Sequence, residues 1–504
     1  MPASRSARAP RRAATALVAA LLATALAACG SSLDPEEVAS ARGVEGTSTG
    51  TDGGTVGTDG TIDPGTTDPG TDPGTSDPGT SDPGISDPGT GPGASDPGSS
   101  GGDDPGSGPG TPATTDSPVT NAGSCDGFKN GPGVTDTTIT IGNSSDISGP
   151  IPGLFETAQD GMKAFVAYFN ASTPDGICGR KLVLKTYDSR TDAAADQQAY
   201  TDACRNVFAM VGSQSAFDSG GAATAQQCGL PDLRASSVTS ARNACSTCFG
   251  VQAVNTANFE NAVPAFVKRF GGTSAFQNAA MLYVSAGAAG ENGKAQVRAM
   301  ERYGMKFTVE QGIDVTEFNY VPYVQKLKDE GVQTVFYVGS FDLSAKLRLA
   351  MQQQGYKPKL YLRDPTDYNP GYIQQGGSAV DGTVVFTNFV PFEEAKSNRE
   401  MSNYLGWLQQ VKPGAVPQFF GVFSWSAGRL FVDLASKLGG QLTRESLIDA
   451  TRKTNTWTAQ GLHAPQPVGS RGTGECWRFI QLSGSTWKPL DGTKYRCEGI
   501  TSSR

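Results

Sequence analysis

From Thr138 onward the chain alternates short apolar segments with longer stretches that carry apolar residues at helical spacing. The first pair is the alternating segment 138–142, followed by 154–170, in which Leu154, Met162, Phe165 and Phe169 recur on one helical face. Strands that alternate with helices through short connections form βαβ units on a parallel sheet covered on both faces. This alternation constrains the chain more than any other feature, and it predicts an α/β fold.

The alternation restarts after Cys248, which indicates a second lobe of similar design. Further strands are predicted at 182–187, 207–211, 279–284, 307–310, 334–338, 359–362 and 383–386, and helices at 258–270, 291–303, 320–330, 343–355, 392–411 and 419–438. The last two helices exceed the needs of the second lobe, so we expect the chain to recross and complete the first. A body of about 380 residues is also too long for one ordinary core.

The N-terminus, residues 1–28, contains four arginines, no acid and an Ala/Leu-rich stretch from Ala13. This stretch predicts a signal peptide, because it is too short and small-sided for a permanent membrane span. It ends in Leu26-Ala-Ala-Cys29, which resembles a bacterial lipobox, so Cys29 is predicted to be acylated and to begin the mature chain. Several acyl chains hold a protein on a membrane. We therefore expect an extracytoplasmic protein that is lipid-anchored to the bacterial cell membrane.

Residues 29–124 form a linker with eight Asp-Pro-Gly triplets between Asp63 and Gly106. Frequent proline and glycine exclude helix and sheet, and repelling aspartates extend the coil, so this segment is predicted to be disordered. It holds sixteen acids against one arginine from residue 31, which leaves the body close to neutral although the whole chain carries a charge of -8. The charge gives no support to nucleic-acid binding.

Eight cysteines remain after Cys29 is set aside, an even number that suits four disulfides outside the cytoplasm. Sequence alone permits 105 pairings. Proximity along the chain favours Cys476 with Cys497, Cys204 with Cys228, Cys245 with Cys248, and then Cys125 with Cys178. The CxxC spacing of Cys245 and Cys248 also suits a redox or zinc site, but no second ligand pair accompanies it. We expect a structural disulfide, no metal and no cofactor.

Several segments together carry a family resemblance: "ITIGNSSDISGP", "VFAMVGSQSA", "LPDLRASSVTS", "VQTVFYVGSFDLSAKLRLAMQQQGYKPKLYL" and "AVDGTVVFTNFVPF". Their order resembles substrate-binding proteins of ABC importers with the type I periplasmic binding protein fold, in the leucine/isoleucine/valine-binding-protein-like group. The resemblance implies two Rossmann-like lobes joined by hinge strands, with lobe 1 at 125–253 plus 388–458 and lobe 2 at 254–387 plus 459–504. It also implies a monomer that closes over a small polar ligand, such as an amino acid, amide or carboxylate, and that docks on an ABC permease.

Candidate ligand-binding residues follow from the strand ends, because ligands of parallel α/β sheets bind beyond the carboxyl ends of the strands. Serine and threonine at helix starts are also common caps, an alternative that stays open for each hydroxyl. With the positions carried over from the family, the candidates are Ser148, Ser215, Ala216, Ser236, Ser237, Ser285, Phe341, Asp364 and Asp367.

Two positions depart from the pattern of the amino-acid binders. Val238 replaces a ligand-binding threonine of the family. The tyrosine that the family has after the strand at 279–284 is replaced by small residues, and the next aromatic residue is Phe341 instead of a tyrosine. A donor lost from a buried site leaves its partner unpaired and costs about 1–3 kcal/mol. These departures weaken the prediction of a branched-chain amino acid and leave the prediction of a receptor intact.

Enzymatic function is not expected. The only histidine, His463, lies in a Gly/Pro-bounded turn, and no phosphate-binding loop or HExxH motif occurs in the body. Asp188 and Asp192 are close in sequence but are predicted to lie in an exposed turn. Two alternatives remain: a lipoprotein that senses a ligand with the same fold without transport, and, with less support, a secreted hydrolase.

Overall fold

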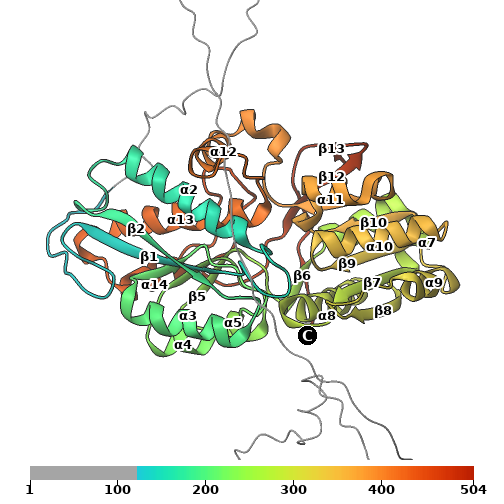
Figure 1. Ribbon diagram of the computed structural model, residues 1–504, viewed down its shortest axis with the longest axis horizontal. Helices are drawn as coiled ribbons and strands as arrows, with labels where there is room; N and C mark the ends of the chain where they lie inside the picture. The colour runs from blue at the N-terminus through green and yellow to red at the C-terminus, as the bar shows by residue number, and fades with distance from the viewer. Residues whose placement is uncertain (1–121) are drawn as a thin grey trace, which may run out of the picture. The chain divides into compact units, whose positions relative to one another are not determined.

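The computed structural model describes residues 122–504, and its first sheet is entirely parallel (Figure 1). The sheet has the order β2-β1-β3-β4-β5. Its strands are β1 (Thr138–Ser145), β2 (Lys181–Asp188), β3 (Ala209–Val211), β4 (Asp232–Ser236) and β5 (Cys248–Gln252). The signal peptide, Cys29 and all but the last residues of the linker lie outside the described residues.

Both faces of this sheet are covered, because successive side chains of a strand point to opposite faces. In β3, Ala209 and Val211 belong to one buried cluster and Met210 to another. The first cluster lies under α2 (Glu156–Ser172), α12 (Arg399–Val411), α13 (Phe419–Leu438) and α14 (Arg444–Arg452). The second lies under α3 (Ala193–Asn206) and α4 (Ala222–Gln227), and Cys245 joins it directly after α5 (Ser240–Ala244).

Helices α2 and α13 approach each other closely at a pair of glycines. A Cβ on Gly161 would lie 2.5 Å from the carbonyl oxygen of Gly421, closer than any side-chain carbon can sit. Glycine therefore permits this approach, which brings a helix from late in the chain onto the first sheet. The predicted recrossing of the chain has its structural basis here.

The second sheet has the order β13-β12-β11-β10-β9-β7-β8. Its parallel strands are β7 (Ala279–Val284), β8 (Phe307–Ile313), β9 (Thr334–Val338), β10 (Leu360–Arg363) and β11 (Val384–Thr387). The strands β12 (Cys476–Ser483) and β13 (Thr486–Leu490) extend it in antiparallel fashion, and the short β14 (Arg496–Cys497) pairs with β12. The predicted α/β fold with two parallel sheets is confirmed.

Helices again lie on both faces of the second sheet (Figure 1). One buried cluster joins it to α6 (Ala262–Phe266), α7 (Gly272–Gln277) and α8 (Gly287–Arg302). Another joins it to α9 (Val321–Asp329) and α10 (Phe341–Gln353), and α11 (Pro370–Gly376) follows β10. The division of residues between the two lobes given above stays a prediction.

A third, two-stranded sheet pairs β6 (Asn258–Glu260) with β15 (Ile500–Ser502) in antiparallel fashion. The prediction of a continuous helix over 258–270 is therefore wrong at its start. The predicted helix over 392–411 is also divided, since a 3-10 segment at Phe392–Ser397 precedes α12. In both cases the chain forms a short element that depends on its tertiary neighbours and that the apolar spacing does not reveal.

All four predicted disulfides are present: Cys125–Cys178, Cys204–Cys228, Cys245–Cys248 and Cys476–Cys497. The last joins β12 to β14 at directly paired residues. Within 122–504, no helix has the length and apolar character needed to cross a membrane.

Candidate ligand-binding cavity

A cavity of about 280 Å³ lies where the carboxyl ends of both parallel sheets meet. Gln214, Ser215 and Ala216 line it from the loop after β3, and Gly339 and Ser340 from the loop after β9. Carboxyl ends are where parallel sheets bind ligands, since loops and helix starts converge there. A molecule in this cavity would touch both sheets at once.

Most of the lining is apolar. It includes seven aromatic residues and several branched aliphatic ones: Phe155, Phe217, Phe259, Phe386, Phe419, Phe420 and Trp477, with Ile151, Leu154, Val238, Val254, Val284, Val315 and Val338. The charged lining residues are both acids, Glu260 and Asp364; no lysine, arginine or histidine of the described chain lines the cavity. The cavity is thus an apolar chamber with two carboxyl groups.

Four of the residues predicted from the sequence line this cavity: Ser215, Ala216, Ser236 and Asp364. The other five do not. Ser148 is exposed, and its hydroxyl donates to Asp188 Oδ2 at 2.6 Å. Ser285 is exposed, while Ser237 is buried behind the lining.

Two further candidates, Asp367 and Phe341, contact residues of the protein interior instead of the cavity. Asp367 is fully buried and pairs with Arg363, whose Nε lies 2.7 Å from Oδ2, and it also accepts from Ser344 Oγ at 2.6 Å. Its charge is therefore neutralised inside the lobe, which explains why it does not serve the cavity. The Phe341 ring packs against Gly371 of α11 and the main core instead of the cavity.

Backbone donors at the rim of the first sheet are already used by two buried aspartates. Asp146 accepts from the N–H of Ala216 at 2.8 Å, and Asp218 accepts from the N–H groups of Val238 and Thr239 at 2.9 and 3.3 Å. Burial raises the pKa of Asp146, although its hydrogen bonds oppose that shift. The backbone N–H groups that a ligand carboxylate would need are thus already bound to carboxylates of the protein.

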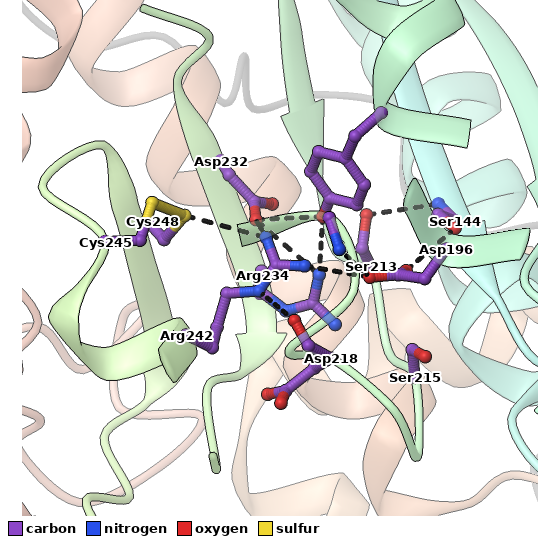
Figure 2. Close-up of polar contacts among 12 residues, drawn as sticks. Ser144, Asp196, Ser213, Ser215, Asp218, Asp232, Arg234, Arg242, Cys245 and Cys248 are labelled. Carbon is purple, nitrogen blue, oxygen red and sulfur yellow. Dashed lines mark hydrogen bonds and ion pairs between the residues drawn. A yellow bond between two sulfur atoms is a disulfide. The ribbon is translucent and has the colours of Figure 1, made fainter. Parts of the chain in front are cut away.

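Behind this rim lies a fully buried network of two arginines and two aspartates (Figure 2). Arg242 donates to Asp196 at 2.9 Å and to Asp232 at 2.8 Å, and its Nε donates to the carbonyl of Asp218. Arg234 donates to the hydroxyl of Tyr200, which donates to Asp232. The two positive and two negative charges balance, so the network fixes the loops after β3 and β4 without offering a charge to the cavity.

Glu260 presents the opposite case. Its side chain lines the cavity from β6 and is 3% exposed, and no described residue donates to its Oε1. Burial raises the pKa of its carboxyl group well above the ordinary value, with no nearby cation to reverse the shift. Ser340, in the loop after β9, also lines the cavity with a hydroxyl that lacks a hydrogen-bond partner. The sequence predicts a ligand-site loop at Ser340–Asp342, whereas Glu260 was not among the sequence candidates.

The residues considered for catalysis are structural. His463 is buried, stacks on Phe423 and bonds to Ser426, and burial lowers its pKa to about 4. Asp192 caps α3 through the N–H of Ala195, and Asp188 binds the N–H groups of Ile147 and Ser148. In residues 122–504 no group of His, Cys, Asp and Glu side chains is arranged to hold a metal ion.

The chain has recognisable relatives. A family model described as periplasmic binding protein matches residues 138–485. A fatty acid ABC transporter substrate-binding protein from Thermomonospora curvata is 18% identical, with a TM-score of 0.61, over 75% of this chain and 96% of that one. No curated protein matches the sequence.

Two further solved structures carry amino acids. A branched-chain amino acid ABC transporter protein from Thermus thermophilus with bound valine is 15% identical, with a TM-score of 0.59, over 72% of this chain and 97% of that one. A branched-chain amino acid substrate-binding protein from Streptococcus pneumoniae in complex with isoleucine is 14% identical, with a TM-score of 0.59, over 71% and 99%. Such identities establish a shared fold and leave the ligand open.

Proposed function

The chain belongs to the periplasmic binding protein family, and from this we propose that it is the solute-binding receptor of an ABC importer. The cavity between the carboxyl ends of the two sheets carries the proposal, because a ligand there contacts both. Such a ligand binds the closed arrangement more tightly than an open one and shifts the population toward it. The closed form is then the one that the membrane permease recognises.

Ligand chemistry is the part of the proposal that the fold does not supply. The sequence led us to expect a small polar molecule, such as an amino acid, amide or carboxylate. Relatives of the same fold are named for branched-chain amino acids and for fatty acids. The apolar lining here favours a molecule with a substantial hydrocarbon or aromatic part.

A metabolite screen tests the receptor function. The full chain is mixed with a library of amino acids, amines, amides, fatty acids and sugars, and its melting temperature is followed. A ligand at 100 times its Kd stabilises the folded state by about 2.7 kcal/mol, which a thermal shift detects. We expect one class to raise the melting temperature and to shrink the radius of gyration in X-ray scattering. A binder that leaves the scattering unchanged would argue against closure.

The location outside the cytoplasm and the lipid anchor are also proposed. They depend on the signal peptide and Cys29. Expressed in a bacterium with its own signal, the chain is expected in the membrane fraction, and Cys29→Ala is expected to release it into the soluble fraction. Recovery of both forms in the same fraction would remove the anchor from the proposal.

A further inference from the structure

The cavity is unsuited to a free ligand carboxylate. At the first-sheet rim, the N–H groups of Ala216, Val238 and Thr239 already bind Asp146 and Asp218. A ligand anion at this rim would find these three donors saturated by protein carboxylates. Moving a charge out of water without a partner is costly, so an anionic end is disfavoured in this part of the cavity.

Glu260 supplies the opposite preference. Its carboxyl group is buried in the cavity wall, and its Oε1 has no donor among the described residues. Asp364 adds a second acid, whose Oδ1 accepts from the N–H of Thr366 at 2.9 Å. The lining contributes no cation from the described chain. A buried carboxyl group left in this way gains most from a ligand that donates hydrogen bonds and carries positive charge.

Aromatic residues in the lining of the same cavity suit the same ligand. Phe259 precedes it in β6, and the rings of Phe259 and Phe386 lie 6.5 Å apart, with Trp477 5.4 Å from Phe386. All three rings line the cavity. The negative face of an aromatic ring attracts a cation in a desolvated site, and the ring also buries hydrocarbon.

We propose that the cavity binds an organic amine, with its ammonium group on Glu260 and its apolar body against Phe259, Phe386 and Trp477. This inference rests on the receptor function proposed above and assigns its ligand class. Ser340, in the loop after β9 of the second sheet, has a hydroxyl that also lacks a partner and receives a second polar group of the ligand. The raised pKa of Glu260 in the empty protein agrees, because a carboxyl group without a cation holds its proton.

Four probes with one aromatic ring test the assignment: 2-phenylethylamine, 2-phenylethanol, 3-phenylpropanoate and phenylalanine. Their affinities for the full chain are measured by isothermal titration calorimetry. We expect the amine to bind at least tenfold more tightly than each of the other three. Tighter binding of 3-phenylpropanoate or phenylalanine would overturn the amine assignment and would still support the receptor function.

Glu260→Gln is the matched variant, since it keeps the shape and removes the charge. We expect it to weaken 2-phenylethylamine at least tenfold and to change 2-phenylethanol less than threefold. The control is Glu330→Gln, an exposed acid at the end of α9, which is expected to change neither. Melting of each variant checks folding. If Glu260→Gln leaves the amine affinity unchanged, or if none of the four probes binds, the amine assignment is wrong. If the metabolite screen then finds a ligand of another class, the receptor function still holds.

Discussion

Two buried acidic regions lie near the cavity, one behind the first-sheet rim and one in the cavity wall, and they differ in whether a cation of the protein faces the carboxyl groups. Behind the first-sheet rim, Asp196 and Asp232 face Arg242 and Arg234 inside the protein. In the wall itself, Glu260 has no counterpart from the described chain. Both arrangements bury carboxyl groups, yet only in the first does each carboxylate face an arginine, although Asp232 Oδ1 and Arg234 Nη2 have no hydrogen-bond partner there. A buried carboxylate paired with an arginine of the chain serves the fold, while a buried carboxyl group in a cavity wall without a cation is available to a ligand.

Removing the shared cation should have the largest effect. Arg242→Met leaves two buried carboxylates without their principal partner, and breaking a buried pair in this way costs about 3–5 kcal/mol of the free energy of unfolding. Urea unfolding of the full chain measures it. The control is Arg452→Met, which breaks a surface pair with Asp449 and is expected to cost less than about 1 kcal/mol. Equal losses of stability in the two variants would mean that the buried network contributes no more than a surface ion pair.

His463 extends the comparison to a neutral group that is paired inside the fold. Its pKa of about 4 lies below the ordinary value of 6.5, so the unfolded chain takes up a proton first as the pH falls. The contribution of His463 to the free energy of unfolding is therefore fully present above pH 6.5. It falls by about 1.4 kcal/mol per pH unit down to pH 4, about 3 kcal/mol in total.

His463 is the only histidine, but buried acids with a raised pKa, such as Glu260, change stability with the opposite sign over the same pH range. The difference in slope between the wild type and His463→Asn from pH 6.5 to 5 therefore isolates the histidine, and we expect wild-type stability to rise with pH by about 1.4 kcal/mol per unit more than that of the variant. Denaturant unfolding at several pH values measures the slope in both proteins. Equal slopes in the two proteins would contradict the lowered pKa of His463.

Glu260 should show the reverse sign. Its pKa is raised in the folded state, so the unfolded chain loses the proton first as the pH rises. The wild-type protein then loses about 1.4 kcal/mol per pH unit between the ordinary pKa of glutamate and the pKa in the fold. Glu260→Gln removes this loss. We expect the free energy of unfolding of the variant, measured with denaturant, to be higher than that of the wild type at pH 7 and equal to it near pH 4. A variant less stable than the wild type at pH 7 would show that the carboxyl group has a partner.

Two serines on the second lobe give the smallest and most closely matched test. Ser344 Oγ donates to Asp367 and lies 2.8 Å from the hydroxyl of Tyr361, so Ser344→Ala should cost about 1–3 kcal/mol. Ser340 Oγ has no partner, so Ser340→Ala should change the free energy of unfolding by less than about 0.5 kcal/mol. Thermal unfolding of both variants compares them. A large loss at Ser340 would remove it from the set of groups available to a ligand.

Much of the fold was predictable because its signal is local. The bounds predicted for β7, β9 and α13 are those observed. Strand β6 was missed, because its three residues are held by β15, more than 200 residues further along the chain. A clue was present in Pro264, which belongs in the first turn of a helix and so argues against a helix that begins at Asn258.

The candidate site was predictable only in part for a related reason. Ser215, Ala216, Ser236 and Asp364 follow strands, and strand ends are readable in a sequence. The importance of Glu260 depends on the absence of a nearby cation and of a donor to Oε1, which is a property of its surroundings in three dimensions. Asp367 also follows a strand, but it pairs with Arg363 and does not line the cavity. Arg363 lies only four residues away, yet the sequence does not show whether its side chain faces solvent or this aspartate.

Strand β15 offers an engineering handle on the cavity. Ile500 pairs with Glu260 across the two-stranded sheet, and the Cys476–Cys497 disulfide holds the preceding segment against β12. A fluorophore on Ser502, which is exposed, would therefore sit on the strand next to the one that carries the proposed amine contact. With such a label the protein becomes an optical sensor, whose colour or intensity changes as ligand fills the chamber, without any alteration of the lining itself.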